Sequence, residues 1–267
     1  FNSDKLIIKN SGVDNNAYES IKIKDNLIIT GIQAVCPEFD ISKIKILSEN
    51  EIPFSNGLGS SAAALCTGLL IGNYLIGNKF SLEDLNEKAI KIEGHPDNVT
   101  PCLFGGLTIS VFNEKKDKWI IRKIDVSSEL NIMVFTPNFI SNTNNSRKKL
   151  SKSVTRSAAV YNISRVALLI DSLNKKDFTF LNEATKDSLH QDTRLEGFPE
   201  MRSIMNAAID GGALGAIVSG SGPSVMIFTK GNEFTIDYEI KEVARKHNLD
   251  GSIILTKPSN QGIILSK

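Results

Sequence analysis

Residues 53–63 read PFSNGLGSSAA, in which two glycines stand directly before a run of serines and alanines. The Ile- and Leu-rich residues 41–48 upstream predict a strand, and the apolar residues 60–75 predict a buried helix. Glycine lets a backbone approach a ligand closely, and the start of a helix offers free N–H groups at the positive end of its dipole. Residues 53–59, the glycine loop, therefore predict a site for an anion such as a phosphate chain.

The glycine loop alone does not choose a class of protein. It is not a Walker A loop, because no lysine follows the glycines in a Gly-Lys-Ser/Thr arrangement. It also lacks the spacing of a Gly-x-Gly-x-x-Gly dinucleotide turn. A Gly-x-Gly pair is equally typical of a tight turn before a helix, so further segments must decide between these interpretations.

A second polar segment, residues 92–101, reads IEGHPDNVTP and follows a helix predicted over residues 82–93. It places an imidazole, a carboxylate and a carboxamide within four residues, at His95, Asp97 and Asn98. Such a cluster can bind a polar ligand, orient it by hydrogen bonds or exchange a proton. The other interpretation is a polar loop that only caps the helix.

A third segment, residues 212–224, reads GALGAIVSGSGPS and predicts a strand that runs into a second glycine-rich turn. Glycines at the end of a strand allow another backbone or a ligand to come close. We therefore expect this turn to approach either the glycine loop or the substrate.

These three segments, in this order, resemble the signatures of the GHMP kinases, and the Pro-x-x-x-Gly-Leu-Gly-Ser-Ser-Ala pattern is matched at every position. The second segment is similar to the Glu-Gly-His-Pro-Asp-Asn-Val-x-Pro run of the homoserine kinases in particular. The resemblance implies ATP-dependent phosphorylation of the hydroxyl of L-homoserine to O-phospho-L-homoserine, a step in threonine biosynthesis. The alternatives are another GHMP kinase, for mevalonate or a sugar, and a ligand-binding relative without catalysis.

Two further segments resemble family patterns and supply cations that suit the carboxylate of an amino-acid substrate. Residues 143–147 resemble a Thr-x-x-x-Arg segment, and residues 187–194 resemble Asp-x-Leu-His-Gln-x-x-Arg. The simpler interpretations are a solvated basic face around Arg147 and a surface ion pair at Arg194.

The resemblance implies the following site residues. ATP, the co-substrate, is bound by Pro53, Asn56, Gly57, Leu58, Gly59, Ser60, Ser61 and Ala62. Mg²⁺ is held by Ser61 and Glu87, whose oxygens suit that metal. Homoserine is bound by His95, Asp97, Thr143, Arg147, Arg194 and Gly220, and the catalytic residues are Asp97, Asn98 and Arg147. Asp97 is expected to bind substrate rather than to act as a dedicated base, and Asn56 stands where many relatives carry Arg.

Strands and helices mix without strict alternation, which favours an α+β fold over a doubly wound parallel sheet. The other predicted strands lie at residues 5–9, 107–112, 119–124, 131–136, 216–218 and 225–228, with two short Ile-rich strands at the end of the chain. The other predicted helices lie at residues 155–173, 177–189, 202–210 and 238–247. Residues 26–34 fit a strand or a helix, and the resemblance favours the helix.

The resemblance implies two domains, an N-terminal ATP-binding domain over residues 1–129 and a C-terminal domain over residues 130–267. The first is expected to resemble ribosomal protein S5 domain 2, with a left-handed βαβ unit, and the second to be ferredoxin-like. The family's opening strand and its Ala-Asn-Leu-Gly-Pro-Gly-Phe-Asp-type segment have no counterpart in residues 1–40. We therefore expect the natural chain to extend before Phe1.

Composition adds few constraints. The 267 residues carry a net charge of +1, which gives no overall field for binding nucleic acid or an anionic membrane. No apolar run reaches the ~18 residues that cross a bilayer. The three cysteines, Cys36, Cys66 and Cys102, show no metal or disulfide spacing, so reduced thiols in a cytoplasmic protein are expected. The resemblance also suggests a homodimer.

Overall fold

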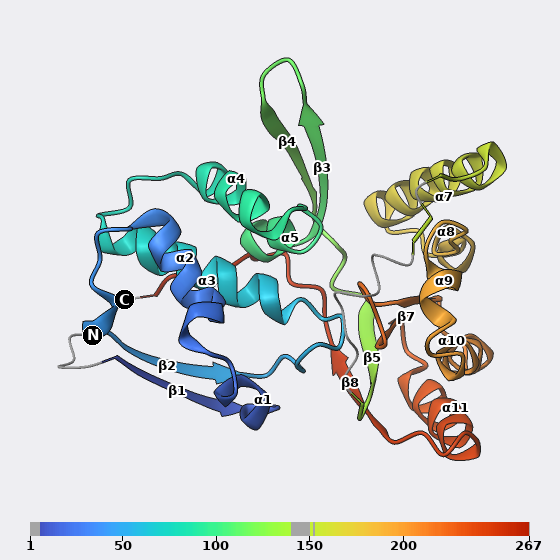
Figure 1. Cartoon of the computed structure of the whole chain (residues 1–267). Helices are drawn as coiled ribbons and strands as arrows, with labels where there is room; N and C mark the ends of the chain where they lie inside the picture. The colour runs from blue at the N-terminus through green and yellow to red at the C-terminus, as the bar shows by residue number, and fades with distance from the viewer. Residues whose placement is uncertain (1–5, 140–149, 152, 267) are drawn as a thin grey trace. The chain divides into compact units, whose positions relative to one another are not determined.

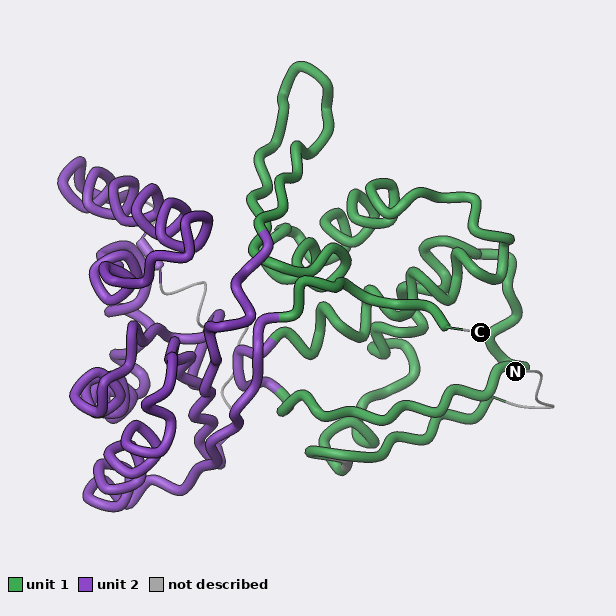
Figure 2. Tube along the Cα trace, turned by 180° about the vertical axis from the view of Figure 1, so that it is seen from behind, with its two compact units in different colours: residues 1–54, 59–124, 259–267 green, residues 55–58, 125–258 purple. Residues whose placement is uncertain are grey.

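The computed structural model describes residues 6–139, 150–151 and 153–266. The chain forms two compact units, which Figure 2 colours separately. Unit 1 comprises Phe1–Phe54, Gly59–Ile124 and Ser259–Lys267, and unit 2 comprises Ser55–Leu58 and Asp125–Pro258. The domain boundary expected near residue 129 stays a prediction. Unit 1 is discontinuous, because the residues after 258 return to it.

The first part of unit 1 pairs two parallel strands, β1 (Ile7–Gly12) and β2 (Lys45–Asn50). The helix favoured over residues 26–34 is confirmed as α2 (Leu27–Val35), because the Asn26 side chain accepts the backbone N–H groups of the first turn. The strand predicted from residue 41 begins only at residue 45. The prediction was wrong for its first residues, because Ile41–Lys43 form a 3₁₀ turn capped by Asp40. A short helix, α1 (Asn15–Glu19), was not predicted.

Two helices of unit 1 have the predicted bounds, α3 (Ser60–Leu75) and α4 (Leu82–Glu93). Helix α4 begins with a capping box between Ser81 and Asp84, which satisfies two backbone N–H groups that the first turn would leave unpaired. Both helices bury apolar residues together with α5 (Val99–Phe104), a helix that was not predicted. The predicted hairpin is confirmed as β3 (Leu107–Asn113) and β4 (Lys118–Ile124), and Figure 1 shows it projecting away from α5.

Unit 2 contains a four-stranded antiparallel sheet in the order β6-β7-β5-β8. The strands are β5 (Asn131–Pro137), β6 (Gly215–Val218), β7 (Val225–Thr229) and β8 (Gly251–Thr256). Helices α10 (Glu200–Asp210) and α11 (Glu233–Lys246) share one buried apolar cluster with the sheet. The mixture of a parallel strand pair, an antiparallel sheet and packed helices gives the expected α+β class.

The remaining helices show where the predictions were wrong. Helix α7 (Arg156–Lys175) matches its prediction, but the helix predicted over 177–189 reduces to one turn, α8 (Leu181–Ala184). A further short helix, α9 (Gln191–Leu195), follows it. Helix α11 begins five residues before the predicted start.

The end of the chain holds one strand instead of the two predicted. After β8, residues 257–266 form no regular element, and the backbone N–H of Ile263 instead donates to the carbonyl of Cys102 in α5. The residues return to unit 1 through contacts so close that a Cβ on Gly262 would lie 2.0 Å from the Leu103 carbonyl oxygen. Across the described residues, every helix is too short or too polar to cross a lipid bilayer.

Candidate functional site

The start of α3 has the backbone geometry that the glycine loop predicts. Gly59 takes the left-handed conformation, with φ 78°, and serves as the N-cap of α3. No side chain of the described residues caps this end. Because the first turn of a helix has no intrahelical partners for its N–H groups, this end offers donors to an anion. Ser61 lies exposed in that first turn, with a hydroxyl available to a ligand.

The chain that leads into the glycine loop is held by residues 14–18, which belong to none of the motifs found in the sequence. The backbone N–H of Phe54 donates to Asp14 Oδ2 at 2.8 Å, and the Tyr18 hydroxyl donates to the Ile52 carbonyl at 3.1 Å. The rings of Tyr18 and Phe54 pack edge to face, with centroids 5.1 Å apart. Burial raises the pKa of Tyr18, so the hydroxyl keeps its proton as a donor. Residues 14–18 therefore fix the direction in which the chain enters the loop.

In unit 2, residues 55–58 of the glycine loop lie against the second glycine-rich turn. The sequence predicted that this turn approaches either the glycine loop or the substrate, and the structure shows the approach to the loop. The Ser219 hydroxyl donates to the Gly57 carbonyl at 2.9 Å. A Cβ on Gly57 would lie 2.2 Å from the Ser219 carbonyl oxygen, and one on Gly220 would lie 2.8 Å from the Gly57 carbonyl oxygen. Both glycines also have positive φ, so only glycine fits this contact without strain. Arg194 also contacts the second glycine-rich turn, since its guanidinium donates to the Gly220 carbonyl.

In unit 1, the second polar segment lies beside the start of α3. Nδ1 of His95 is hydrogen-bonded to the Asp97 carboxylate. Asn98 is the N-cap of α5, and its Oδ1 lies 3.9 Å from the place where a Cβ on Gly59 would stand. The structure thus brings together Gly59, His95, Asp97 and Asn98, which the sequence placed in two separate motifs.

Helix α4 carries two carboxylates, Glu87 and Glu93, that have different neighbours. The predicted metal ligand Glu87 already accepts the backbone N–H of Trp119 in β4 at 2.8 Å through Oε1. Glu93, which was not predicted, ends α4 and has Oε1 3.9 Å from His95 Nε2, with its side chain 18% exposed. Its signal in the sequence was its position two residues before His95. Glu93 therefore belongs with the His95–Asp97 pair, and one oxygen of Glu87 is committed to the hairpin.

In unit 2, the predicted segment 187–194 is organised by the Asp187 carboxylate. Oδ2 of Asp187 accepts the backbone N–H groups of Leu189, His190 and Gln191. This capture of N–H groups forms a turn where the predicted helix over 177–189 would end, and at its start Asp177 Oδ1 accepts the N–H of Thr179 in the same way. Gln191 in turn accepts the N–H of Val218 at 2.9 Å, which leads directly to the second glycine-rich turn.

The same contacts set two pKa values. Burial raises the pKa of Asp187, but the N–H donors of Gln191 and His190 outweigh it, and the pKa lies below its ordinary value. Burial lowers the pKa of His190; the Asp187 carboxylate opposes this shift, and the Arg194 guanidinium adds to it. The charged carboxylate is thus the form that fits this turn.

Asp187→Asn is expected to lower the free energy of unfolding at pH 7 by about 1–2 kcal/mol, because a charged acceptor of several N–H groups is lost. The folded pKa of Asp187 lies below the unfolded value, so its stabilisation is complete above about pH 4 and is lost as the pH falls through the folded pKa. Urea unfolding of both proteins between pH 3 and pH 7 measures this. A difference that stays constant, or widens, towards pH 3 contradicts it.

Some predicted residues cannot be placed. Thr143 and Arg147 lie outside the described residues, and their roles stay predictions. The cysteines are free thiols, as expected, with Cys36 and Cys66 buried and Cys102 partly buried. The Cys66 thiol donates to the Val99 carbonyl at 3.7 Å, and its interaction with the Cys102 thiol raises the pKa of Cys66 and lowers that of Cys102.

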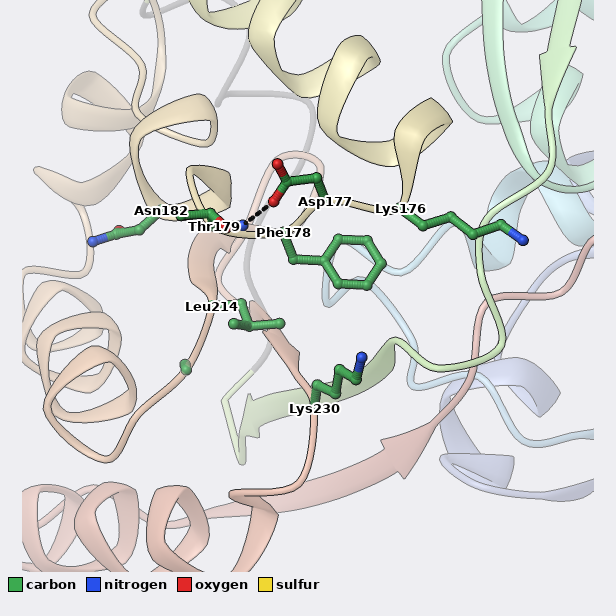
Figure 3. Close-up of a pocket in the computed structure, with 8 residues that line it drawn as sticks. Lys176, Asp177, Phe178, Thr179, Asn182, Leu214 and Lys230 are labelled. Atoms are coloured by element: carbon green, nitrogen blue, oxygen red, sulfur yellow. Dashed lines mark hydrogen bonds between the residues drawn. The ribbon is translucent and has the colours of Figure 1, made fainter.

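A separate open pocket of about 390 Å³ lies in unit 2 (Figure 3). Phe178, Leu214 and Ala213 give it apolar walls, and Lys176 and Lys230 contribute ammonium groups. Lys230 is paired with Glu129 at 2.6 Å, so the charges around the pocket partly cancel. No predicted site residue of the described chain lines it, which separates it from the motifs above.

Two segments of the chain match models of one protein family. Residues 26–106 match the GHMP kinases N terminal domain, and residues 169–245 match the GHMP kinases C terminal domain. A homoserine kinase of Clostridium botulinum is 32% identical over 263 residues, 97% of this chain and 87% of the relative. A homoserine kinase of Halothermothrix orenii is 34% identical over 265 residues, 98% of this chain and 85% of the relative.

Solved structures agree in fold. The crystal structure of homoserine kinase from Cytophaga hutchinsonii aligns with a TM-score of 0.81 at 26% identity, over 98% of this chain and 85% of that one. The L. major mevalonate kinase, solved with R-mevalonate, aligns with a TM-score of 0.67 at 17% identity, over 96% and 84%. The second likeness concerns the fold alone.

Proposed function

Because this chain belongs to the GHMP kinase family, whose members use ATP as co-substrate, we propose that it phosphorylates the side-chain hydroxyl of L-homoserine. The product is O-phospho-L-homoserine, an intermediate of threonine biosynthesis in the cytoplasm. The observation that carries the proposal is the position of Asn98, beside Gly59 at the open end of α3. This proximity of Asn98 to the last residue of the glycine loop supports a shared site for the phosphate chain and the acceptor.

In the reaction, the hydroxyl oxygen of homoserine attacks the γ-phosphorus of ATP, and the bond to the bridging oxygen breaks to release ADP. Phosphoryl transfer asks the protein mainly for alignment and for stabilisation of charge. The N–H groups at the start of α3 hold phosphate oxygens, and Ser60 and Ser61 add hydroxyls. The hydroxyl proton leaves through the phosphate or solvent.

The acceptor is bound by the residues around His95. The Asp97 carboxylate, oriented by His95, binds homoserine, and the neighbouring Asn98 side chain lies near Gly59. In unit 2, Arg194 supports the acceptor carboxylate or the γ-phosphate, and its bond to the Gly220 carbonyl fixes the guanidinium. Thr143 and Arg147 are proposed to act on the same side.

The oxygen donors present suit Mg²⁺, which when bound would neutralise negative charge on the triphosphate. Ser61 offers an exposed hydroxyl in the first turn of α3. Glu87 is the carboxylate predicted from the sequence, and Glu93 is the one that the structure adds beside His95. Only one of the two needs to act as a ligand.

Matched variants assign the metal carboxylate. If Glu87 is the ligand, Glu87→Gln is expected to raise the Mg²⁺ concentration for half-maximal rate by at least about tenfold, since a neutral amide is a poor Mg²⁺ ligand. Glu93→Gln is then expected to change it less than threefold. The reverse ranking in a magnesium titration at saturating ATP transfers the role to Glu93.

The function is tested by ADP release from magnesium-ATP with homoserine, mevalonate and galactose as acceptors. Turnover with homoserine alone supports the proposal, and turnover with mevalonate or galactose instead assigns the chain to another GHMP kinase activity. Saturable homoserine binding without ADP release identifies a non-catalytic relative. The resemblance also suggests a homodimer, which sedimentation of the same protein measures.

A further inference from the structure

The core of unit 1 contains one fully buried contact between polar side chains of α4 and α5. The Thr100 hydroxyl donates to Asn86 Oδ1 at 2.9 Å, and both residues are 0% exposed. Their surroundings are apolar, since Leu85, Val99 and Leu103 are buried in the same cluster. A hydrogen bond in such surroundings is directional, whereas the apolar contacts around it are not.

This contact lies between the proposed metal side and the proposed acceptor side. Asn86 directly precedes Glu87 on the helix that ends at Glu93. Thr100 lies in the first turn of α5, two residues after Asn98. Its backbone N–H also donates to the Pro96 carbonyl at 3.0 Å. Thr100 therefore holds α4 with its side chain and the His95–Asn98 segment with its backbone.

The contact is costly for stability. Asn86 Nδ2 is buried and has no hydrogen-bond partner among the described residues. A buried donor without a partner is destabilising, and an apolar pair of similar size avoids that cost. Leucine at 86 and valine at 100 would keep nearly the same volume. The polar pair is thus poorly explained by stability alone, and what it adds is a fixed register between α4 and α5.

We propose that the Asn86–Thr100 hydrogen bond is a positioning contact that sets the His95–Asn98 segment relative to the carboxylates of α4 and so governs acceptor turnover. Neither side chain touches substrate. The turnover part rests on the proposed function, and the geometric part concerns only unit 1.

Three variants separate positioning from stability. Thr100→Val removes the hydroxyl, Thr100→Ser keeps it, and Asn86→Leu/Thr100→Val replaces the polar pair by an apolar one. Thr100→Val is expected to lower kcat with homoserine about tenfold at a nearly unchanged KM for ATP, because small misplacements of aligned groups cost rate. Thr100→Ser is expected to stay within twofold of the parent. The double variant is expected to recover or exceed the parent Tm while kcat stays low.

A double variant that recovers kcat together with Tm overturns the proposal, as does a kcat for Thr100→Val within twofold of the parent. Hydrogen exchange of the backbone N–H groups of residues 97–100 gives a second readout that needs no turnover. Exchange is expected to be at least tenfold faster in Thr100→Val and in the double variant than in the parent. Unchanged exchange refutes the contact's role even if the parent protein phosphorylates no homoserine, so the two failures are distinguishable.

Discussion

Gly57→Ala is expected to lower kcat/KM for ATP by about 100-fold. The new Cβ would lie 2.2 Å from the Ser219 carbonyl oxygen, far inside contact distance, and this oxygen belongs to the backbone, which cannot swing away as a flexible side chain can. Alanine at φ 79° also costs about 1–2 kcal/mol by itself. The loop must therefore move away from Ser219, and the donors that follow it leave their positions on the phosphates.

Gly77→Ala is the matched control. Gly77 has a similar φ of 82°, but a Cβ there meets nothing within 4 Å among the described residues. It thus carries the conformational cost without the collision. Steady-state kinetics with varied ATP, together with Tm, compares the two. Equal kinetic effects in the two variants would show that the approach of Ser219 to Gly57 does not matter for ATP use.

Asp97→Asn is expected to raise the KM for homoserine by about 10–100-fold, with kcat changed only a few-fold. A hydrogen bond to a charged group contributes about 1.5–3 kcal/mol, much of which is lost when the carboxylate becomes an amide, and asparagine keeps the shape of the side chain. His95 keeps a partner oxygen but loses the negative charge beside its ring. The variant therefore weakens binding of the acceptor more than transfer.

Asp117→Asn provides the same chemical change at a distant position of unit 1. Asp117 lies exposed in the turn between β3 and β4 at φ 49°, a conformation that asparagine tolerates. Its kinetics are expected to match the parent. If Asp97→Asn instead abolishes kcat at unchanged homoserine affinity, Asp97 is the general base, and the preference for a binding role is reversed.

The sequence predicted the elements whose signals are local. Helix α4 has its capping box, between Ser81 and Asp84, and α3 has small and apolar residues along its whole length. The prediction over residues 177–189 was wrong at both ends, because apolar spacing does not reveal carboxylates that accept nearby N–H groups. Asp177 accepts the N–H of Thr179, and Asp187 accepts those of Leu189, His190 and Gln191, so turns replace the helix at its start and end. The second Ile-rich strand predicted at the end of the chain was wrong because its signal is not local either. The backbone N–H of Ile263 donates to the Cys102 carbonyl in α5 and not to a neighbouring strand.

The difference between local signals and tertiary contacts also decides which residues of the candidate site could be predicted. The glycine loop and the His95–Asn98 segment were predictable because each is contiguous. Asp14 was not, because its bond to Phe54 spans forty residues and depends on the fold of the segments between them. Glu93 stood in the quoted motif, but only its proximity to His95 distinguishes it from Glu87. Such contacts depend on the tertiary structure, so the spacing of residues in the sequence does not reveal them.

The return of residues 259–263 to α5 also has a consequence for biosynthesis. Ile263 pairs with the Cys102 carbonyl, and the Gly106 N–H donates to the Ser259 carbonyl. A ribosome that has made the chain only as far as Ile124 has therefore not yet supplied every part of unit 1. Domains usually fold as the nascent chain emerges, N-terminal first. Here unit 2 is translated in full before the other unit receives its final segment, so the two must mature in an interleaved order.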